Sequence, residues 1–257
     1  MAKILVTGSA DGIGRQTALM LADAGHQVFL HARNDVRAEA ALAAVPAAEA
    51  VLVGDLASLE QTRVLAKSAA DHGPFETVVH NAGIADSGSR RRTLTEDGLE
   101  RVFQVNVLAP YLLTALMPLP HRLVYLTSGM ASGGTIDLTD LQRERRPWDG
   151  TGAYCDSKLA DIALAFAVAR RQPEVCSNAV CPGWVRSRMG GPSAPTDLRT
   201  GAATQVWLAG SDEPAARVTG RYFRHMRLLE PPEPTLSVSL QEGLLTACAE
   251  LTGMAMH

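Results

Sequence analysis

The chain has 257 residues, of which 46% are hydrophobic and 20% charged, and its formal net charge is -3. This composition supports a buried core and excludes a disordered chain, and the length suits one α/β domain. The absence of a long basic run argues against nucleic acid or an anionic membrane surface as the partner. No apolar run reaches the ~20 residues that cross a bilayer, so we expect no membrane partner.

The cysteines and histidines give no sign of a cross-linked or metal-bound fold. The four cysteines form no CxxC pair and the seven histidines no HExxH motif, so we predict neither a disulfide framework nor a metal site. A first strand that begins at Lys3 leaves no room for a signal peptide. We therefore expect a soluble protein of a reducing compartment, the cytoplasm.

The N-terminal segment has the order strand, glycine turn, helix, strand. Residues 3–7 form a short apolar run, an apolar helical pattern follows the turn, and residues 28–31 form the next run. This is the order of a dinucleotide-binding βαβ unit. Gly8 permits an unusual backbone turn, Gly12 lets the backbone approach a pyrophosphate, and Gly14 lets helix and strand pack closely. A plain glycine-rich turn is the alternative.

The end of the second strand indicates which nucleotide is bound. An acidic residue there would bond both ribose hydroxyls, but this chain has no acid before Asp35. Arg33 can instead bind a 2′-phosphate through charge-assisted bonds and stack on adenine, and Arg15 in the first helix adds a positive charge. A solvated loop arginine is the other reading of Arg33. We predict NADP(H) as the cofactor.

The alternation of strands and helices continues along the chain. The expected strands are residues 3–7, 28–31, 50–53, 77–80, 123–126, 177–180 and 220–223, and the expected helices are residues 13–22, 38–44, 58–70, 99–116, 154–171 and 202–208. The pattern predicts a single-domain α/β Rossmann fold, a doubly wound parallel sheet of about seven strands with helices on both faces.

Two segments depart from this alternation. Residues 132–151 form an excursion in which we expect one short helix near residues 138–143, and the tail after Pro231 has no clear pattern. We expect one domain over residues 1–257, in which residues 1–130 mainly bind the cofactor and residues 131–257 mainly carry catalysis and substrate binding.

Polar residues follow several predicted strands, at the edge where such sheets bind ligands. Asp55 can accept from an adenine amino group or cap a helix. Asn81 begins an Asn-Ala-Gly turn, and the turn at Pro182 carries Ser187 over the place of a nicotinamide. Asn106 lies in an apolar helix, where its amide needs either a buried backbone partner or a water in a site.

Tyr154 and Lys158 lie four positions apart on a predicted helix and so share one face. An ammonium beside a phenol favours the phenolate, which makes the two residues a plausible acid/base unit. The same spacing also occurs by chance on many solvated helices. Ser128, at the end of the fifth strand, supplies a hydroxyl upstream of the pair.

These motifs, taken in order, resemble the short-chain dehydrogenase/reductase family over nearly the whole chain. They are Thr7-Gly8-x-x-x-Gly12-x-Gly14, Asp55-Leu56, Asn81-Ala82-Gly83, Asn106, Ser128, Tyr154-x-x-x-Lys158, and Pro182-Gly183 with Ser187. The Arg33 pattern is similar to NADP-preferring members. Asp137-Leu138, Arg145-Arg146-Pro147-Trp148 and Ser157-Lys158-Leu159-Ala160 resemble the retinol-dehydrogenase-like and related bacterial carbonyl reductase branch. Ser187 in place of a more frequent threonine, and His80 before the Asn-Ala-Gly turn, depart from the family pattern.

The resemblance implies hydride transfer between a nicotinamide and a small carbonyl or alcohol substrate, with reduction the expected direction. The implied catalytic set is Tyr154 as proton donor or acceptor, Ser128 holding the substrate oxygen, Lys158 on the nicotinamide ribose and Asn106 holding a water. The implied cofactor contacts are Gly8, Ser9, Asp11, Gly12, Ile13, Gly14, Arg15, Arg33, Asn34, Asp55, Leu56, Asn81, Ala82, Gly83, Tyr154, Lys158, Pro182, Gly183, Val185 and Ser187.

The alternative function is a non-catalytic NADP-binding regulator on the same fold, which would be expected to lose one of the four catalytic side chains. An extended-type epimerase fits poorly, because such relatives carry a GxxGxxG turn and a longer C-terminal domain. The resemblance also suggests a homodimer or homotetramer that pairs through the helix after Tyr154, where Ala160, Ala163 and Ala167 permit close contact. A monomer is also open, because the longer insert before Tyr154 occurs in monomeric relatives too, and the sequence does not identify the substrate.

Overall fold

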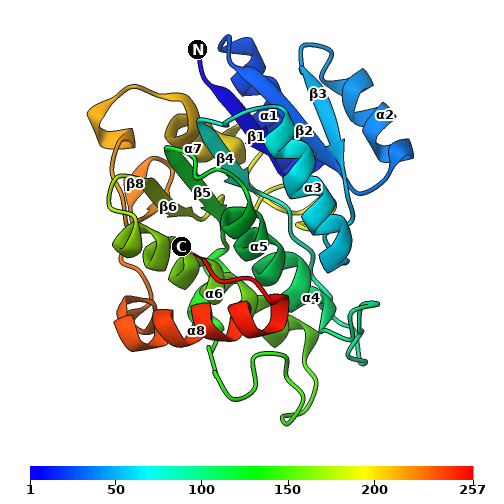
Figure 1. Ribbon diagram of the computed structural model, residues 1–257, viewed down its shortest axis with the longest axis vertical. Coiled ribbons are helices and arrows are strands. Elements are labelled where there is room, and N and C mark those ends of the chain that lie inside the picture. The colour runs from blue at the N-terminus through cyan, green and yellow to red at the C-terminus, as the bar shows by residue number, and fades with distance from the viewer. Residues whose placement is uncertain (257) are drawn as a thin grey trace.

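A computed structural model describes residues 1–256 as one sheet with helices on both faces. The strand order is β3-β2-β1-β4-β5-β6-β7-β8 (Figure 1). The strands are β1 Lys3–Val6, β2 Gln27–Ala32, β3 Ala50–Val53, β4 Thr77–His80, β5 Arg122–Leu126, β6 Cys176–Val180, β7 Arg221–Arg224 and β8 Arg227–Leu228. The first seven pair in parallel, which confirms the predicted doubly wound fold.

The strand β8 adds one strand to the seven expected. It pairs antiparallel with β7 through a two-residue turn at His225 and Met226, which both have positive φ. Two-residue hairpin turns usually contain Asn-Gly or Asp-Gly, and a His-Met pair is not a recognisable turn sequence. The sequence therefore did not reveal it.

The helices correspond to the predicted segments with shifted ends. They are α1 Gly12–Asp23, α2 Asp35–Ala44, α3 Leu59–Asp71, α4 Arg101–Phe103, the π-helix η1 Gln104–Leu108, α5 Ala109–Leu116, α6 Gly150–Arg171, α7 Leu198–Gly210 and α8 Val238–Thr252. Short 3-10 turns lie at η2 Gly129–Gly133, η3 Pro214–Ala216 and η4 Glu233–Leu236. Side chains that accept from free N–H groups begin most of the longer helices, as Ser58 does for α3.

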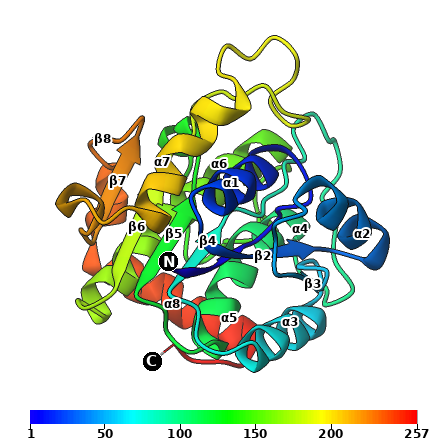
Figure 2. The same cartoon turned by 90° about the horizontal axis from the view of Figure 1, so that it is seen from above.

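Alternate residues of the central strands face two separate cores, as the period of two in a β-strand requires. Leu5 and Val78 point into the core under α3, α5 and α6, whereas Val6 and Val79 point into the core under α1, α2 and α7. Figure 2 shows α1 and α7 on one side of the sheet and α3, α5 and α8 on the other. The sheet is therefore covered on both faces.

The helix α6 is buried along almost its whole length, because the tail after Pro231 folds back as α8 across it (Figure 1). Ala160, Ala163 and Ala167 are at most 2% exposed, so their small size serves packing inside this chain. Glu242 of α8 pairs with the last two arginines of α6 and fastens one helix to the other. The oligomeric state stays a prediction.

Two predicted helices differ from the structure. The short helix expected near residues 138–143 is wrong: residues 134–149 contain turns only. Asp140 accepts from the backbone N–H groups of Glu144 and Arg145, and Arg143 takes a positive φ, so the backbone there cannot be helical. The helix expected over residues 99–116 contains the π segment.

No helix among residues 1–256 is long and apolar enough to cross a membrane.

Candidate active site

The carboxyl ends of β1, β2, β4, β5 and β6 border a cleft of about 1120 Å³. Most of the residues predicted from the sequence line it, namely Gly8, Asp11, Gly12, Ile13, Gly14, Arg33, Asp55, Leu56, Asn81, Ala82, Gly83, Ser128, Tyr154, Lys158, Pro182, Gly183, Val185 and Ser187. Ser9, Arg15, Asn34 and Asn106 do not line it. Residues from all along the chain thus meet at one edge of the sheet.

The glycine turn after β1 packs directly on the turn after β4. Gly8 has a φ of +63° and Gly12 a φ of +55°, both in the left-handed region that glycine tolerates best. A Cβ atom on Gly8 would lie 2.7 Å from the Ala82 Cα atom, and one on Gly14 would lie 2.3 Å from the Asn81 amide nitrogen. The Asn81 amide donates to the carbonyl oxygens of Thr7 and Gly8, so the two turns form one rigid cradle.

Replacing Gly14 by alanine should lower the free energy of unfolding by roughly 1–3 kcal/mol, the usual cost of overpacking. Alanine in a helix would normally stabilise by roughly 0.5–1 kcal/mol, but here the clash with Asn81 outweighs that gain. Urea denaturation measures the difference. Gly133→Ala is the matched control, because no atom lies within 4 Å of a Cβ placed there. Equal stability of the two variants would contradict the close packing.

Two of the four residues outside the cleft, Ser9 and Asn34, have structural roles beside it. The buried Ser9 hydroxyl accepts from the His31 backbone N–H, and the Asn34 side chain caps α2 by accepting from the Arg37 N–H. Arg15 lies on α1 and does not line the cleft. His31, which sequence reasoning did not single out, accepts from the Gly8 N–H and bonds Gly54 through its other nitrogen, so it fixes the glycine turn.

Positive charge gathers where β2 ends. Arg33 is exposed and lines the cleft. Arg37, in the first turn of α2, also lines the cleft. Arg37 lies 3.6 Å from the Asp11 carboxylate, and Arg188, from the loop after β6, lies 2.7 Å from the same carboxylate. Arg37 therefore lines the cleft together with Arg33, whereas Arg15 does not. The only sequence signal was the spacing, since Arg37 is four residues further along the same chain segment.

Tyr154, Ser128 and Lys158 line the same part of the cleft. Tyr154 lies in the first turns of α6 and is 8% exposed, and the Lys158 ammonium lies 6.0 Å from the centre of its ring. Ser128 lies at the end of β5 and caps η2 by accepting from the Met130 N–H. The helix and the strand end thus present a phenol, an ammonium and a hydroxyl to one space.

Asn106 lies beneath this group, in the π-helix η1, and is fully buried. Its amide oxygen accepts from the Ile84 N–H at 2.8 Å, and its amide nitrogen donates to the Ile84 carbonyl and to the Ser157 hydroxyl. Ser157 in turn donates to the Tyr154 carbonyl. Asn106 therefore ties the turn after β4 to the helix that carries Tyr154 and Lys158. One lone pair of its oxygen remains for a further donor.

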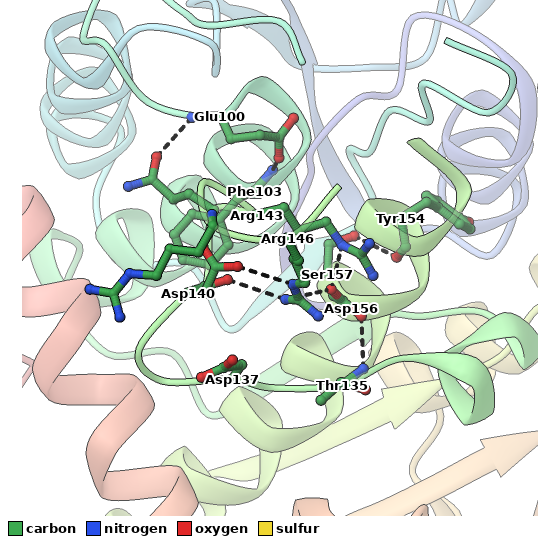
Figure 3. A network of polar contacts seen from close by, with 12 residues as sticks. Glu100, Phe103, Thr135, Asp137, Asp140, Arg143, Arg146, Tyr154, Asp156 and Ser157 are labelled. Carbon is green, nitrogen blue, oxygen red and sulfur yellow. Dashed lines mark hydrogen bonds and ion pairs between the residues drawn. The ribbon is translucent and has the colours of Figure 1, made fainter. Parts of the chain in front are cut away.

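The insert at residues 132–151 is bound to α6 by a buried polar network around Asp156 (Figure 3). One Asp156 oxygen accepts from the Thr135 N–H at 2.7 Å, and the other contacts the guanidinium groups of Arg143 and Arg146 at 2.8 and 3.1 Å. Arg146 also pairs with the buried Asp140 of the insert. The insert is therefore fixed to the helix that carries Tyr154, although its own residues do not line the cleft.

Glycines let the insert approach α6 closely. A Cβ atom on Gly152 would lie 2.4 Å from the Arg143 guanidinium, and one on Gly134 would lie 2.4 Å from the Cys155 carbonyl oxygen. At the other end of the insert, Gln142 accepts from the Glu100 N–H where α4 begins. The insert thus contacts α6 through its backbone and the start of α4 through the Gln142 side chain.

Comparison with known proteins places the chain in a family. The family model described as short chain dehydrogenase matches residues 2–197. The uncharacterized oxidoreductase AN7799 of Emericella nidulans is 40% identical over 100% of this chain and 99% of its own length. The short-chain dehydrogenase chyC of Penicillium rubens is 38% identical with the same coverage. Retinol dehydrogenase 13 of Mus musculus is 31% identical over 98% of this chain and 84% of its own.

Solved structures share the fold. An uncharacterized protein of Mycobacterium paratuberculosis has a TM-score of 0.85 at 24% identity, covering 100% of this chain and 95% of its own. A Shigella flexneri protein described as a short chain dehydrogenase, complexed with NADP, has a TM-score of 0.66 at 28% identity, covering 88% and 97%. The chain therefore belongs to the short-chain dehydrogenase/reductase family, in which it is a retinol-dehydrogenase-like oxidoreductase.

Proposed function

We propose that the protein reduces a carbonyl compound with NADPH in the cytoplasm, and that Tyr154 is the proton donor. The observation that carries the proposal is the meeting of Ser128, Tyr154 and Lys158 in a cleft that also holds the glycine cradle and Arg33. A pure binding protein would not need a phenol, an ammonium and a hydroxyl at one point, and no relative reported above supports the regulator reading.

The residues of the cradle fit a dinucleotide. Gly8 and Gly12 have no side chains to obstruct a pyrophosphate, and the N-terminus of the 12-residue helix α1 presents N–H groups there. Asp55 and Leu56 line the adenine end of the cleft, and Pro182 to Ser187 border the other end. When bound, the nicotinamide would supply the hydride; the protein supplies placement and electrostatics.

Each side chain of the catalytic set has a separate task in the proposed reaction. Ser128 donates a hydrogen bond to the carbonyl oxygen and orients it toward Tyr154. Tyr154 gives its hydroxyl proton to that oxygen as negative charge develops on it. The Lys158 ammonium stabilises the phenolate left behind and bonds the ribose. Asn106 holds the helix that carries both in place, and its free lone pair can hold the water that resupplies the proton.

The cofactor preference should depend on Arg33 and Arg37. Removing either guanidinium should weaken NADPH binding roughly 10-fold or more, since one charge-assisted bond to a phosphate contributes about 1.5–3 kcal/mol. NADH binding should stay within a factor of about two, because NADH lacks the 2′-phosphate. Titration of both cofactors into Arg33→Ala and Arg37→Ala, by calorimetry, measures this. Arg199→Ala, at an exposed arginine of α7 that does not line the cleft, is the matched control, and an equal loss for NADH would refute the phosphate role.

The substrate side of the cleft is lined by exposed apolar side chains. Met130 is 43% exposed, Trp184 56% and Met189 53%, and all three line the cleft near Tyr154 or Ser187. Apolar surface left open to water in this way fits a bulky apolar carbonyl compound rather than a sugar. An assay of NADPH oxidation over aliphatic, aromatic and hydroxylated ketones and aldehydes tests it. Turnover with hydroxylated compounds alone would refute the apolar preference, and no turnover with any would refute the proposed reaction.

A further inference from the structure

A buried carboxylate lies directly behind the Lys158 ammonium. The Asp161 oxygen Oδ2 is 2.7 Å from the Lys158 Nζ atom, one turn along α6, and both side chains are at most 5% exposed. The Lys158 ammonium also donates to the Leu126 carbonyl at 2.9 Å. Because an ammonium has three N–H donors, two are occupied from behind and one remains for the cleft.

We propose that Asp161 is a positioning residue, the counter-ion that keeps Lys158 both charged and aimed into the cleft. The inference rests on the proposed function for its catalytic meaning, but the ion pair itself stands on the geometry of α6. Sequence reasoning assigned Asp161 no role. The four residues of the catalytic set do not include it, and it does not touch the cleft.

Burial makes this counter-ion necessary. Burial by itself lowers the pKa of the Lys158 ammonium, and the Asp161 carboxylate together with Tyr154 more than offsets that effect, so that the pKa lies above its usual value. Burial likewise raises the pKa of Asp161, against the opposing effect of Lys158. A fully buried lysine without a partner can lose roughly 3–5 pH units of its pKa and become neutral in the working range. A neutral amine would neither stabilise a phenolate nor hold a fixed direction.

The other titratable groups that face the pair cannot replace Asp161. Tyr154 faces Lys158 from α6, and Tyr125 faces Asp161 from β5. Burial raises the pKa of Tyr125, whose hydroxyl bonds Thr114, so this phenol stays neutral. Beside it, burial lowers the pKa of His80 to about 3, so the imidazole is neutral as well. Asp161 is thus the carboxylate that balances the lysine.

The second oxygen of Asp161 argues for a role beyond stability. The Oδ1 atom is buried and has no hydrogen-bond partner among residues 1–256. An unpaired buried carboxylate oxygen costs free energy that an apolar side chain of similar size would not. Its presence is explained if the charge, rather than the packing, is what the site requires.

Lysine-selective NMR tests the proposal without reference to activity. The chain has three lysines, Lys3, Lys67 and Lys158, so a protein labelled with lysine carrying ¹³C at Cε gives three assignable signals. The titration of Lys158 should move down by at least about one pH unit in Asp161→Asn, which keeps the shape and removes the charge. Lys3 and Lys67 should titrate unchanged and are internal controls. An unchanged Lys158 titration in Asp161→Asn would overturn the proposal.

Activity measurements then test the counter-ion role of Asp161 separately from the proposed carbonyl reduction. The alkaline limb of kcat/KM for NADPH-dependent reduction should move to lower pH by the same amount as the Lys158 titration, while kcat near pH 6.5 changes only a few-fold. An NMR shift in an enzyme that reduces no carbonyl would refute the proposed function and leave the counter-ion intact. Turnover whose pH profile does not change in the variant would refute the counter-ion. Asp197→Asn, at the N-terminus of α7, is the matched surface control.

Thermal unfolding covers the case in which Asp161→Asn does not fold well. Lys158→Met leaves a buried carboxylate without its partner and should lower Tm, and Asp161→Asn should do the same by stranding the ammonium. The double variant should then be more stable than the sum of the two single losses predicts, by at least a few degrees. Additive losses in Tm would overturn the pairing.

Discussion

Replacing Tyr154 by phenylalanine should reduce kcat/KM for carbonyl reduction by about 10²–10⁴, the range that general acid catalysis usually contributes. The Tyr154 side chain is only 8% exposed, and a phenylalanine ring would keep the same packing. The phenol oxygen is all that is lost. NADPH binding should therefore change little, and single-turnover reduction measured with a fixed amount of bound NADPH isolates the chemical step.

Tyr111→Phe is the matched control for this variant. The Tyr111 hydroxyl donates to the Met254 carbonyl on the far side of α5, so its removal should leave reduction unaffected. A Tyr154→Phe enzyme that turns over like the wild type would refute Tyr154 as the acid. The Ser128→Ala variant should show a smaller loss, because it removes one hydrogen bond to the substrate oxygen and leaves the proton donor.

Replacing Asp156 by alanine should destabilise the protein by about 3 kcal/mol, because it strands the largely buried Arg143 guanidinium and removes one of the two carboxylates that pair with Arg146. The Asp156 side chain is 10% exposed, and those of Arg143 and Arg146 are 12% and 26% exposed. At this chain length the loss corresponds to a fall in Tm of roughly 6–12 °C. Differential scanning calorimetry measures it.

The same change should release the insert from α6. Trypsin should then cut after Arg143 or Arg145 faster than in the wild type, whereas Pro147 protects the bond after Arg146. Asp137→Ala is the control inside the insert, since its carboxylate bonds Thr139 two residues on. Slow cleavage and an unchanged Tm in Asp156→Ala would show that the network does not hold the insert.

The sheet and the place of the site could be predicted because both follow from local rules. A run such as residues 77–80 is a buried strand by composition, and parallel strands bring their carboxyl ends together whatever lies between them. Gly8 and Gly14 are needed wherever two turns meet at van der Waals distance. Each of these features depends on a few adjacent residues, so the resemblance to one family was enough to predict them.

What the sequence did not reveal depends on contacts between distant residues. The insert has no period because Asp156, twenty-one residues from Thr135, organises it from outside. The helix α8 covers α6, but the sequence of α8 does not indicate which part of the fold it packs against. Arg37 follows Arg33 by four residues and Asp161 follows Lys158 by three, but such spacings between charged residues are common, so the sequence alone does not single out either residue.

The π-helix η1 bears on how this chain tolerates insertions and deletions. A π segment amounts to one residue added to an α-helix, so α4 and α5 lie out of phase with each other by about 100°. Deleting one residue from Gln104–Leu108 would restore a regular helix and rotate everything on one side of it. Either Asn106 would leave Ile84 and Ser157, or α5 would turn its apolar face out of the core. This five-residue stretch is therefore expected to accept substitutions at its apolar positions far more readily than any change in its length.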